Sequence, residues 1–147
     1  MTQKTIRYAG ALALAVMSLS ACGGDDASSD PNSGNYDPAK TTLKDAGLEV
    51  CAEVQQQEAQ TLASGPGVTN VRSFDVAKDC NGSKTAPNQI SVFQFDSKEA
   101  VDAGAAKVKA AFPDAATLQT GPLIIVATGP NKEENLAAVE KALPEGL

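Results

Sequence analysis

The sequence predicts an α+β domain in which a small antiparallel sheet of three to four strands is packed by two amphipathic helices. Three observations lead to this class. Several short segments carry the period-two pattern of strands, one later run is apolar throughout, and two longer segments place apolar residues at helical spacing. The chain has 147 residues, of which 42% are hydrophobic, so it can form one such domain with a modest core but not two.

The domain is predicted to begin with a short helix. Asp37 is a good capping residue, and Pro38 is well accepted in the first turn of a helix. The helix is predicted to end at Gly47, which favours a left-handed cap, with Leu48 packed against Leu43.

A strand is predicted for residues 48–54. Its apolar residues fall on one face, and Glu49, Cys51 and Glu53 fall on the other. Residues 55–63 are mostly helix formers, but the periodicity does not decide where the strand ends and a helix begins. The run Ser64-Gly65-Pro66-Gly67 ends the segment.

A hairpin with a long connection is predicted next. Residues 71–77 form its first strand, residues 80–88 its loop, and residues 90–95 its second strand. Phe93 and Phe95 share one face of the second strand, so the opposite face carries Ile90, Val92 and Gln94. If both faces are not covered, an apolar patch is left for a partner or an apolar ligand.

A helix capped by Asp96 or Ser97 and running to about Phe112 is predicted to follow, because its apolar residues fall on one face: Val101, Ala105, Val108 and Phe112. Pro113 stops this helix.

An unbroken apolar run over residues 123–126 predicts a strand that is central or buried on both faces. After the turn Gly129-Pro130, Asn131 and Glu134 have the spacing of a capping box at the start of a last helix. The buried stripe of this helix is Leu136, Val139 and Leu143. The order of elements is compatible with a ferredoxin-like βαββαβ unit that carries an extra C-terminal helix.

The first 22 residues have the organisation of an export signal. Lys4 and Arg7 precede an uncharged, mostly apolar core over residues 8–19, which is shorter than the roughly 20 residues that a membrane-spanning helix needs. Small residues and then Cys22 follow, and the quartet Leu19-Ser20-Ala21-Cys22 resembles the lipobox of bacterial lipoproteins.

The resemblance to bacterial lipoproteins implies cleavage before Cys22 and attachment of lipid to its sulfur. Residues 1–21 would then be a signal peptide, and the protein would be anchored to the extracytoplasmic face of a cell membrane. No Asp follows Cys22 directly, which in a cell with two membranes would permit sorting to the outer membrane. The alternatives are an ordinary secretory signal with a chance cysteine, or an uncleaved anchor helix.

Residues 22–37 are predicted to be a disordered acidic tether, and residues 38–147 the single domain. The tether has four Asp, neither Lys nor Arg, and Tyr36 as its one large apolar residue. A calcium site among these aspartates is disfavoured, because charges on a flexible segment usually only solvate it. Removal of residues 1–21 takes away two positive charges and no negative ones, so the net charge changes from −6 to −8.

The three cysteines divide into one lipidation site and one pair. With Cys22 acylated, Cys51 and Cys80 remain, and an even pair outside the cytoplasm predicts a disulfide. Two unpaired thiols are the alternative. A redox pair is disfavoured because no Cys-x-x-Cys motif occurs.

The composition excludes several functions. The chain has no His and a net charge of −6, which excludes histidine triads and histidine metal sites and argues against nucleic-acid binding. Glu49 and Glu53 share the polar face of the first strand, where a solvated role is favoured over acid–base catalysis. We therefore expect a non-catalytic binding domain with no cofactor, no metal and no catalytic residue. Its partner would be an envelope protein or a small apolar ligand; a small envelope enzyme and a structural spacer are the alternatives.

Overall fold

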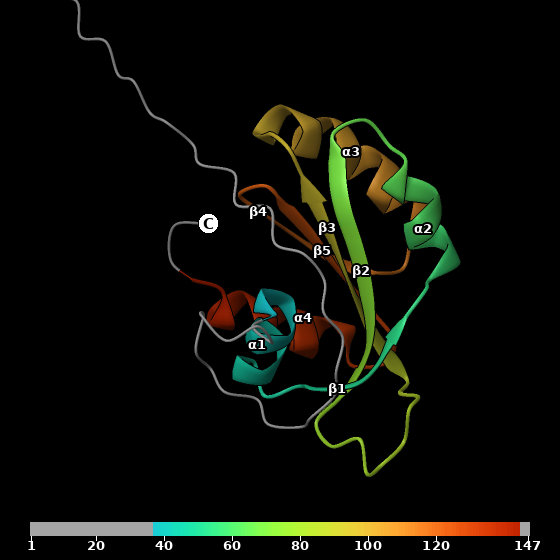
Figure 1. The fold of residues 1–147 in the computed structure, drawn as a ribbon, viewed down its shortest axis with the longest axis vertical. Coiled ribbons are helices and arrows are strands. Elements are labelled where there is room, and N and C mark those ends of the chain that lie inside the picture. Colours follow the sequence, from blue (N-terminus) through green and yellow to red (C-terminus); the bar gives the residue numbers. More distant parts are fainter. Residues whose placement is uncertain (1–36, 145–147) are drawn as a thin grey trace, which may run out of the picture.

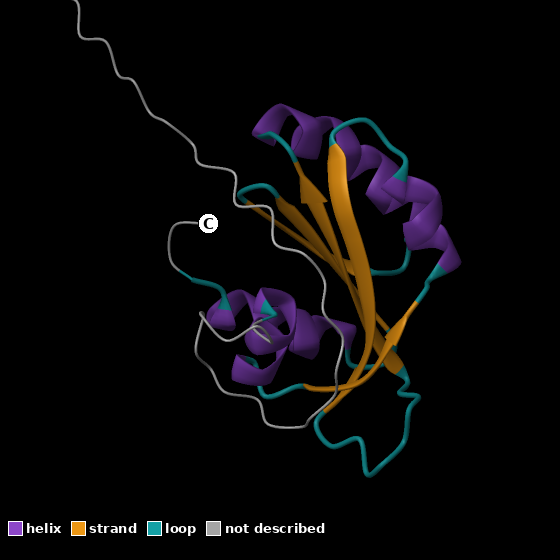
Figure 2. Ribbon diagram, viewed as in Figure 1, coloured by secondary structure: helices purple, strands orange, loops and turns teal. Residues whose placement is uncertain are grey.

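The computed structural model describes residues 37–144, which form three layers: one antiparallel sheet with helices on both faces (Figures 1 and 2). The elements in chain order are α1 (Pro38–Asp45), β1 (Glu49–Val54), α2 (Gln57–Ala63), β2 (Val68–Ala77), β3 (Asn88–Phe95), α3 (Lys98–Ala111), β4 (Ala116–Thr120), β5 (Leu123–Thr128) and α4 (Lys132–Ala142).

The sheet has five strands in the order β1-β2-β3-β5-β4, and every neighbouring pair is antiparallel. The predicted hairpin is confirmed as the pair β2–β3. The predicted apolar strand is also confirmed, since β5 lies inside the sheet and its residues Ile124, Ile125, Val126 and Ala127 are all buried.

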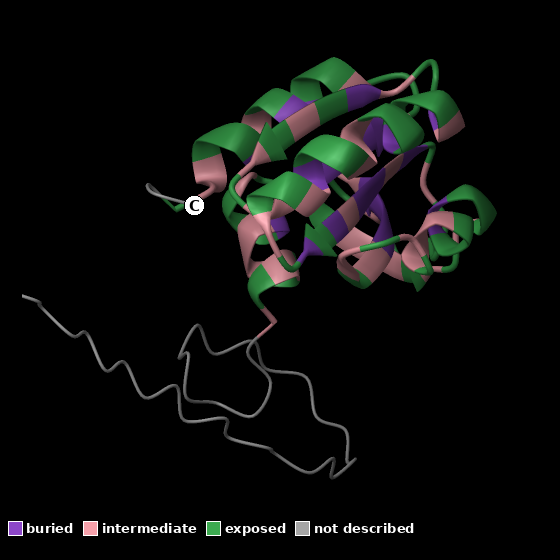
Figure 3. Cartoon of the chain, turned by 90° about the horizontal axis from the view of Figure 1, so that it is seen from above, coloured by how far each residue is buried: buried purple, intermediate pink, exposed green. Residues whose placement is uncertain are grey.

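Two separate cores hold the layers together, one on each face of the sheet (Figure 3). Helices α1 and α4 cover one face, where Leu43 and Val139 pack with Phe74 and Ile90. Helices α2 and α3 cover the other face, and their core includes Ala59, Phe93, Phe95, Val101, Val108, Phe112 and Val126. The predicted buried stripe of α3 is therefore confirmed at Val101, Val108 and Phe112, with Ala105 partly buried against the same core.

The general class is confirmed, but the predicted count of three to four strands and two packing helices is wrong. The strand that the prediction lacks is β4, which has the sequence ATLQT. It lies at the edge of the sheet, and only Ala116 among its residues is buried. Its sequence therefore has too few apolar residues to show the alternation that is typical of a strand. The two further helices that pack on the sheet are α1, which is predicted as a short helix, and α2, whose start the periodicity leaves open; they have 8 and 7 residues.

The ferredoxin-like topology is found in only half of the sheet. A split βαβ unit has a third strand between the two strands that its helix joins. This holds for β3 and β4, which α3 joins and β5 separates. It does not hold for β1 and β2, which α2 joins and which are direct antiparallel neighbours.

A bulge in β1 overturns the strict alternation predicted for residues 48–54. Val50 pairs with Val76 while Ala52 pairs with Asp75, so Cys51 is an extra residue in the strand. Because of this extra residue, the side chains that follow Cys51 lie on the opposite faces of the sheet from those that strict alternation predicts. Glu49 and Glu53 therefore lie on opposite faces of the sheet and not on one polar face.

The predicted helix ends are largely confirmed. Asp37 caps α1 by accepting from the backbone N–H groups of Ala39 and Lys40, and Gly47 has the left-handed φ of 74° that ends the helix. The backbone N–H of Leu48 returns to the carbonyl of Leu43 at 2.9 Å, and both side chains are buried in one core.

The start of α4 differs from the predicted capping box. Asn131 occupies the cap position, but its side chain makes no capping hydrogen bond. Instead its backbone N–H donates to Oδ1 of Asn88, at the start of β3, at 2.9 Å. The turn is tight here, because a Cβ on Gly129 would lie 2.2 Å from the carbonyl oxygen of Pro87. The predicted stripe of α4 is confirmed, with Leu136 and Val139 buried and Leu143 partly buried.

The predicted signal peptide (residues 1–21), Cys22 and the tether up to residue 36 lie outside the described residues. Within residues 37–144 no helix combines the length and the apolar character needed to cross a membrane. The lipid anchor therefore stays a prediction.

Candidate functional site

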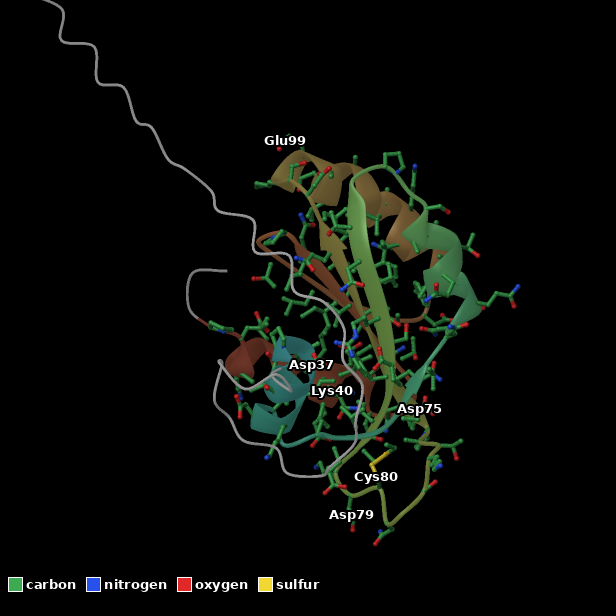
Figure 4. All side chains as sticks on the ribbon, in the orientation of Figure 1. Asp37, Lys40, Asp75, Asp79, Cys80 and Glu99 are labelled. Atoms are coloured by element: carbon green, nitrogen blue, oxygen red, sulfur yellow. A yellow bond between two sulfur atoms is a disulfide. The ribbon has the colours of Figure 1, made fainter. Side chains whose placement is uncertain are left out.

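The predicted disulfide between Cys51 and Cys80 is present, with the two Cα atoms 5.4 Å apart (Figure 4). It joins the bulge of the edge strand β1 to the segment that follows β2. The backbone N–H of Cys80 also donates to Oε2 of Glu49, at 3.0 Å. The bridge and this hydrogen bond fasten one edge of the sheet, which is a structural role.

An ion cluster lies where the chain enters the domain. Arg72, on β2, donates through Nε and Nη2 to the two carboxylate oxygens of Glu53, at 2.9 and 2.8 Å. Its Nη1 donates to Oδ1 of Asp37 at 2.7 Å, and its guanidinium lies 4.9 Å from the ring centroid of Phe74. Lys40 completes the cluster, with Nζ 3.6 Å from Glu53. Two cations and two carboxylates balance, so the cluster presents no net charge to a ligand.

The cluster changes the pKa values of its members. Burial alone would raise the pKa of Asp37, but the hydrogen bonds from Arg72 and from the backbone of Lys40 outweigh it, so that pKa is lowered. The hydrogen bond from Arg72 is the main reason that the pKa of Glu53 is lowered as well. The same bonds raise the pKa of Arg72. Asp37 thus serves the fold as helix cap and ion-pair partner.

Replacing Arg72 by Met should lower the free energy of unfolding at pH 7 by about 1–2 kcal/mol, because two carboxylates lose charged hydrogen bonds while remaining partly exposed. It should also weaken the acid sensitivity of the protein. Carboxyl groups whose pKa values are lowered by folding stabilise the native state above the unfolded pKa, and this contribution is lost as the pH falls from about 5 through the folded pKa values. Urea unfolding followed by circular dichroism between pH 7 and pH 3 measures both effects.

Lys78→Met is the matched control for Arg72→Met. Lys78 forms an ion pair with Glu134, and 73% of its side chain is exposed, so its replacement should change the free energy of unfolding much less than that of Arg72 does. Equal losses of stability and equal pH profiles in the two variants would show that the cluster has no special role.

The sheet face beneath α1 and α4 is covered over only part of its length. Cross-strand partners form three rows on this face, listed from β2 to β4: Phe74, Ile90, Ala127, Ala116; then Arg72, Val92, Ile125, Leu118; then Asn70, Gln94, Leu123, Thr120. All members of the first row are buried, only Ile125 is buried in the second, and none is buried in the third. We call the six exposed or half-buried residues away from the ion cluster the open shelf: Asn70, Val92, Gln94, Leu118, Thr120 and Leu123.

The open shelf shows that the two faces of β3 are not covered along the whole strand. Phe93 and Phe95 are closed off beneath α2 and α3, and Ile90 is closed off beneath α1 and α4. Val92 is half-buried at the border of the core beneath α1 and α4, and Gln94 is exposed. A small patch of mixed apolar and amide character is left, with Arg72 at its border.

The hollows found among the described residues do not suit an apolar small molecule. The space between α2, α3 and the sheet measures about 60 Å³, far below the roughly 300–1,000 Å³ of ligand pockets. A larger depression of about 650 Å³ is lined by Lys98, Gln119, Gly121 and Pro122, and it is an open surface hollow at the β4–β5 turn.

A buried polar network crosses the strands beneath the start of α2. The hydroxyl groups of Ser73 and Ser91 lie 2.7 Å apart, and that of Ser91 donates to the side-chain carbonyl of Gln56 at 2.6 Å. Nearby, Gln89 donates to Asp75, whose exposed fraction is 4%, at 2.9 Å. Both serines are 1% exposed, so a substrate cannot reach them, and the network satisfies polar groups inside the fold.

No family model matches the chain, and neither a curated protein nor a solved structure shows significant similarity to it. Within residues 37–144 no three acidic, cysteine or histidine side chains are grouped so that they could hold a metal ion.

Sequence reasoning missed the ion cluster, although one sign of it was present. Arg72 is the single Arg of the domain and stands two residues before Phe74 in a predicted strand, which places both on one face. Its partners come from α1 and β1, and only the bulge at Cys51 brings Glu53 to the same face.

Proposed function

We propose that this protein is a lipid-anchored protein of the bacterial envelope whose domain binds another protein through the open shelf. One observation carries the proposal: the side chains of the three cross-strand rows become more exposed from row to row. All four are buried in the row beneath α1 and α4, and none is buried in the third row. A sheet that is covered on one face and partly open on the other offers a surface with a fixed backbone. The lipid on Cys22 would hold this surface outside the cytoplasm.

The nature of the shelf favours a protein partner over a small molecule. Val92, Leu118 and Leu123 supply half-buried apolar contacts, while Asn70 and Gln94 offer amide donors and acceptors. Protein interfaces combine an apolar centre with hydrogen bonds at the rim in this way. The space of about 60 Å³ between α2, α3 and the sheet is too small for the apolar ligand considered from the sequence.

Binding is also favoured over catalysis. The hydroxyl groups best placed for a nucleophile, Ser73 and Ser91, are 1% exposed, and the chain has no His to activate them. Asp75 is buried with Gln89 as its hydrogen-bond partner. A spacer with no partner remains the other alternative, and it predicts that no position on the domain captures a protein.

A photoreactive amino acid at position 94 should capture a partner in living cells, whereas the same group at position 60 should not. Gln94 belongs to the open shelf, and Gln60 is also an exposed glutamine, on α2, which covers the opposite face of the sheet. Ultraviolet crosslinking in cells that express the full chain, followed by mass spectrometry, identifies what each position captures. Equal capture at both positions, or none at position 94, would contradict binding through the shelf.

A further inference from the structure

The two edges of the sheet are built differently. Edge strand β1 carries a bulge, a disulfide and two carboxylates, which are devices that keep other strands from pairing with an edge. Edge strand β4 pairs regularly with β5 and has none of these devices. Its residues, ATLQT, include neither a charge nor a proline. Among residues 37–144 no strand pairs with the outer edge of β4, so this edge can accept another strand.

We propose that a second copy of this chain pairs its own β4 with this edge, antiparallel and about a two-fold axis at Leu118. Leu118 would then face Leu118 of the second copy, and Thr117 would face Gln119 of the second copy. Ala116 would face Thr120, so all five residues of β4 are paired and no like charges meet. Two-fold pairing of identical edges is a common way to close a homodimer.

Two oppositely charged residues on α3, Asp102 and Lys109, lie where the same two-fold axis would bring them together. Nε2 of Gln119 donates to Oδ1 of Asp102 at 2.7 Å, which places Asp102 beside the later half of β4. Oδ2 of the same carboxylate pairs with Lys98, one turn earlier on α3, at 2.8 Å. Lys109 lies two turns further along α3, and together with Thr117 it lines a groove of about 210 Å³ between α3 and β4. Asp102 and Lys109 are both exposed.

A two-fold axis at Leu118 exchanges the position of Gln119 with that of Thr117. It therefore brings Asp102 of one copy toward Lys109 of the other, twice in each dimer. Between these two charges on α3 lie Ala105 and Ala106, which line the groove and leave room for the second copy. This charge complementarity is the reason to choose a second copy as the occupant, since an unrelated strand has no reason to match it.

Pairing through β4 would also join the open shelves of the two copies, because Leu118 belongs to both surfaces. This pairing of β4 strands does not depend on what binds the open shelf. A dimer that binds no partner at the shelf would support the pairing alone. A shelf partner bound to a single copy would support only the proposed function.

Thiol crosslinking in cells that express the full chain tests the pairing. In a Leu118→Cys variant the two new thiols would lie on Cβ atoms about 5 Å apart. In a Thr120→Cys variant they would be roughly 13 Å or more apart, since residue 120 faces residue 116 of the second copy. A short bismaleimide should give a crosslinked dimer from Leu118→Cys and none from Thr120→Cys, with the unsubstituted chain as the blank.

Two charge variants in the Leu118→Cys background check the register. Thr117→Lys with Gln119→Lys places lysines opposite one another and should lower the dimer yield by roughly tenfold. Thr117→Glu with Gln119→Lys places opposite charges together and should keep the yield. Absence of the Leu118→Cys dimer, equal dimers from positions 118 and 120, equal yields from the two charge variants, or a crosslink to a different protein would each overturn the proposal.

Discussion

Replacing Cys22 by Ala should transfer the protein from the membrane fraction to the soluble fraction and abolish its labelling with fatty acid. Each buried CH₂ of an acyl chain contributes about 0.8 kcal/mol to membrane binding, so two or three chains hold a protein stably where one holds it only marginally. No helix within residues 37–144 can cross a membrane. The chain carries a net charge of −6, which cleavage before Cys22 would change to −8, so we expect no attraction to anionic lipid.

Ser20→Ala is the matched control, because it changes the lipobox-like quartet while keeping a small residue and the cysteine. This variant should stay in the membrane fraction with its fatty-acid label. If Cys22→Ala also stayed there with its label unchanged, the protein would be held by something other than lipid on this sulfur. Growth of cells in labelled palmitate, followed by fractionation, distinguishes the two results.

Removing the disulfide should cost the domain about 3.5 kcal/mol of unfolding free energy in the chain-entropy model, given that 29 positions separate Cys51 from Cys80. For a domain of this size that loss lowers Tm by about 15 °C. The variant Cys51→Ala with Cys80→Ala avoids leaving one free thiol. Thermal unfolding followed by circular dichroism measures the shift against the unsubstituted protein.

Reduction provides the control for the disulfide variant. A thiol reductant should lower the Tm of the unsubstituted protein to nearly that of the double variant, and it should leave the double variant unchanged. A Tm that responds to neither the substitution nor the reductant would show that the bridge does not stabilise the fold. Two free thiols at Cys51 and Cys80 in the denatured, oxidised protein would show that it does not form.

The features that sequence patterns predicted are those set by neighbours in the chain. The cap at Asp37, the stop at Gly47 and the stripe of α3 depend on residues within a few positions of each other. The apolar run in β5 shows its burial directly, because no polar residue interrupts it. The pairing of Cys51 with Cys80 followed from counting and from the predicted compartment, not from geometry.

The features that sequence patterns missed are set by distant partners. Edge strand β4 is defined by its pairing with β5, and its five residues contain little apolar signal. The bulge at Cys51 is visible only in the register with β2, and it decides on which face Glu53 lies. The open shelf likewise depends on how far α1 and α4 extend over the sheet, which no local pattern contains.

The mass of the intact protein, purified from membranes in detergent, tests most directly whether the domain is an oxidised module held outside the cytoplasm by lipid. We predict a chain that begins at Cys22, carries the added mass of its acyl groups, and is two hydrogens lighter than the reduced form because Cys51 and Cys80 are joined. A chain that still begins at Met1, or an unmodified Cys22, would contradict the anchor and with it the proposed place of action.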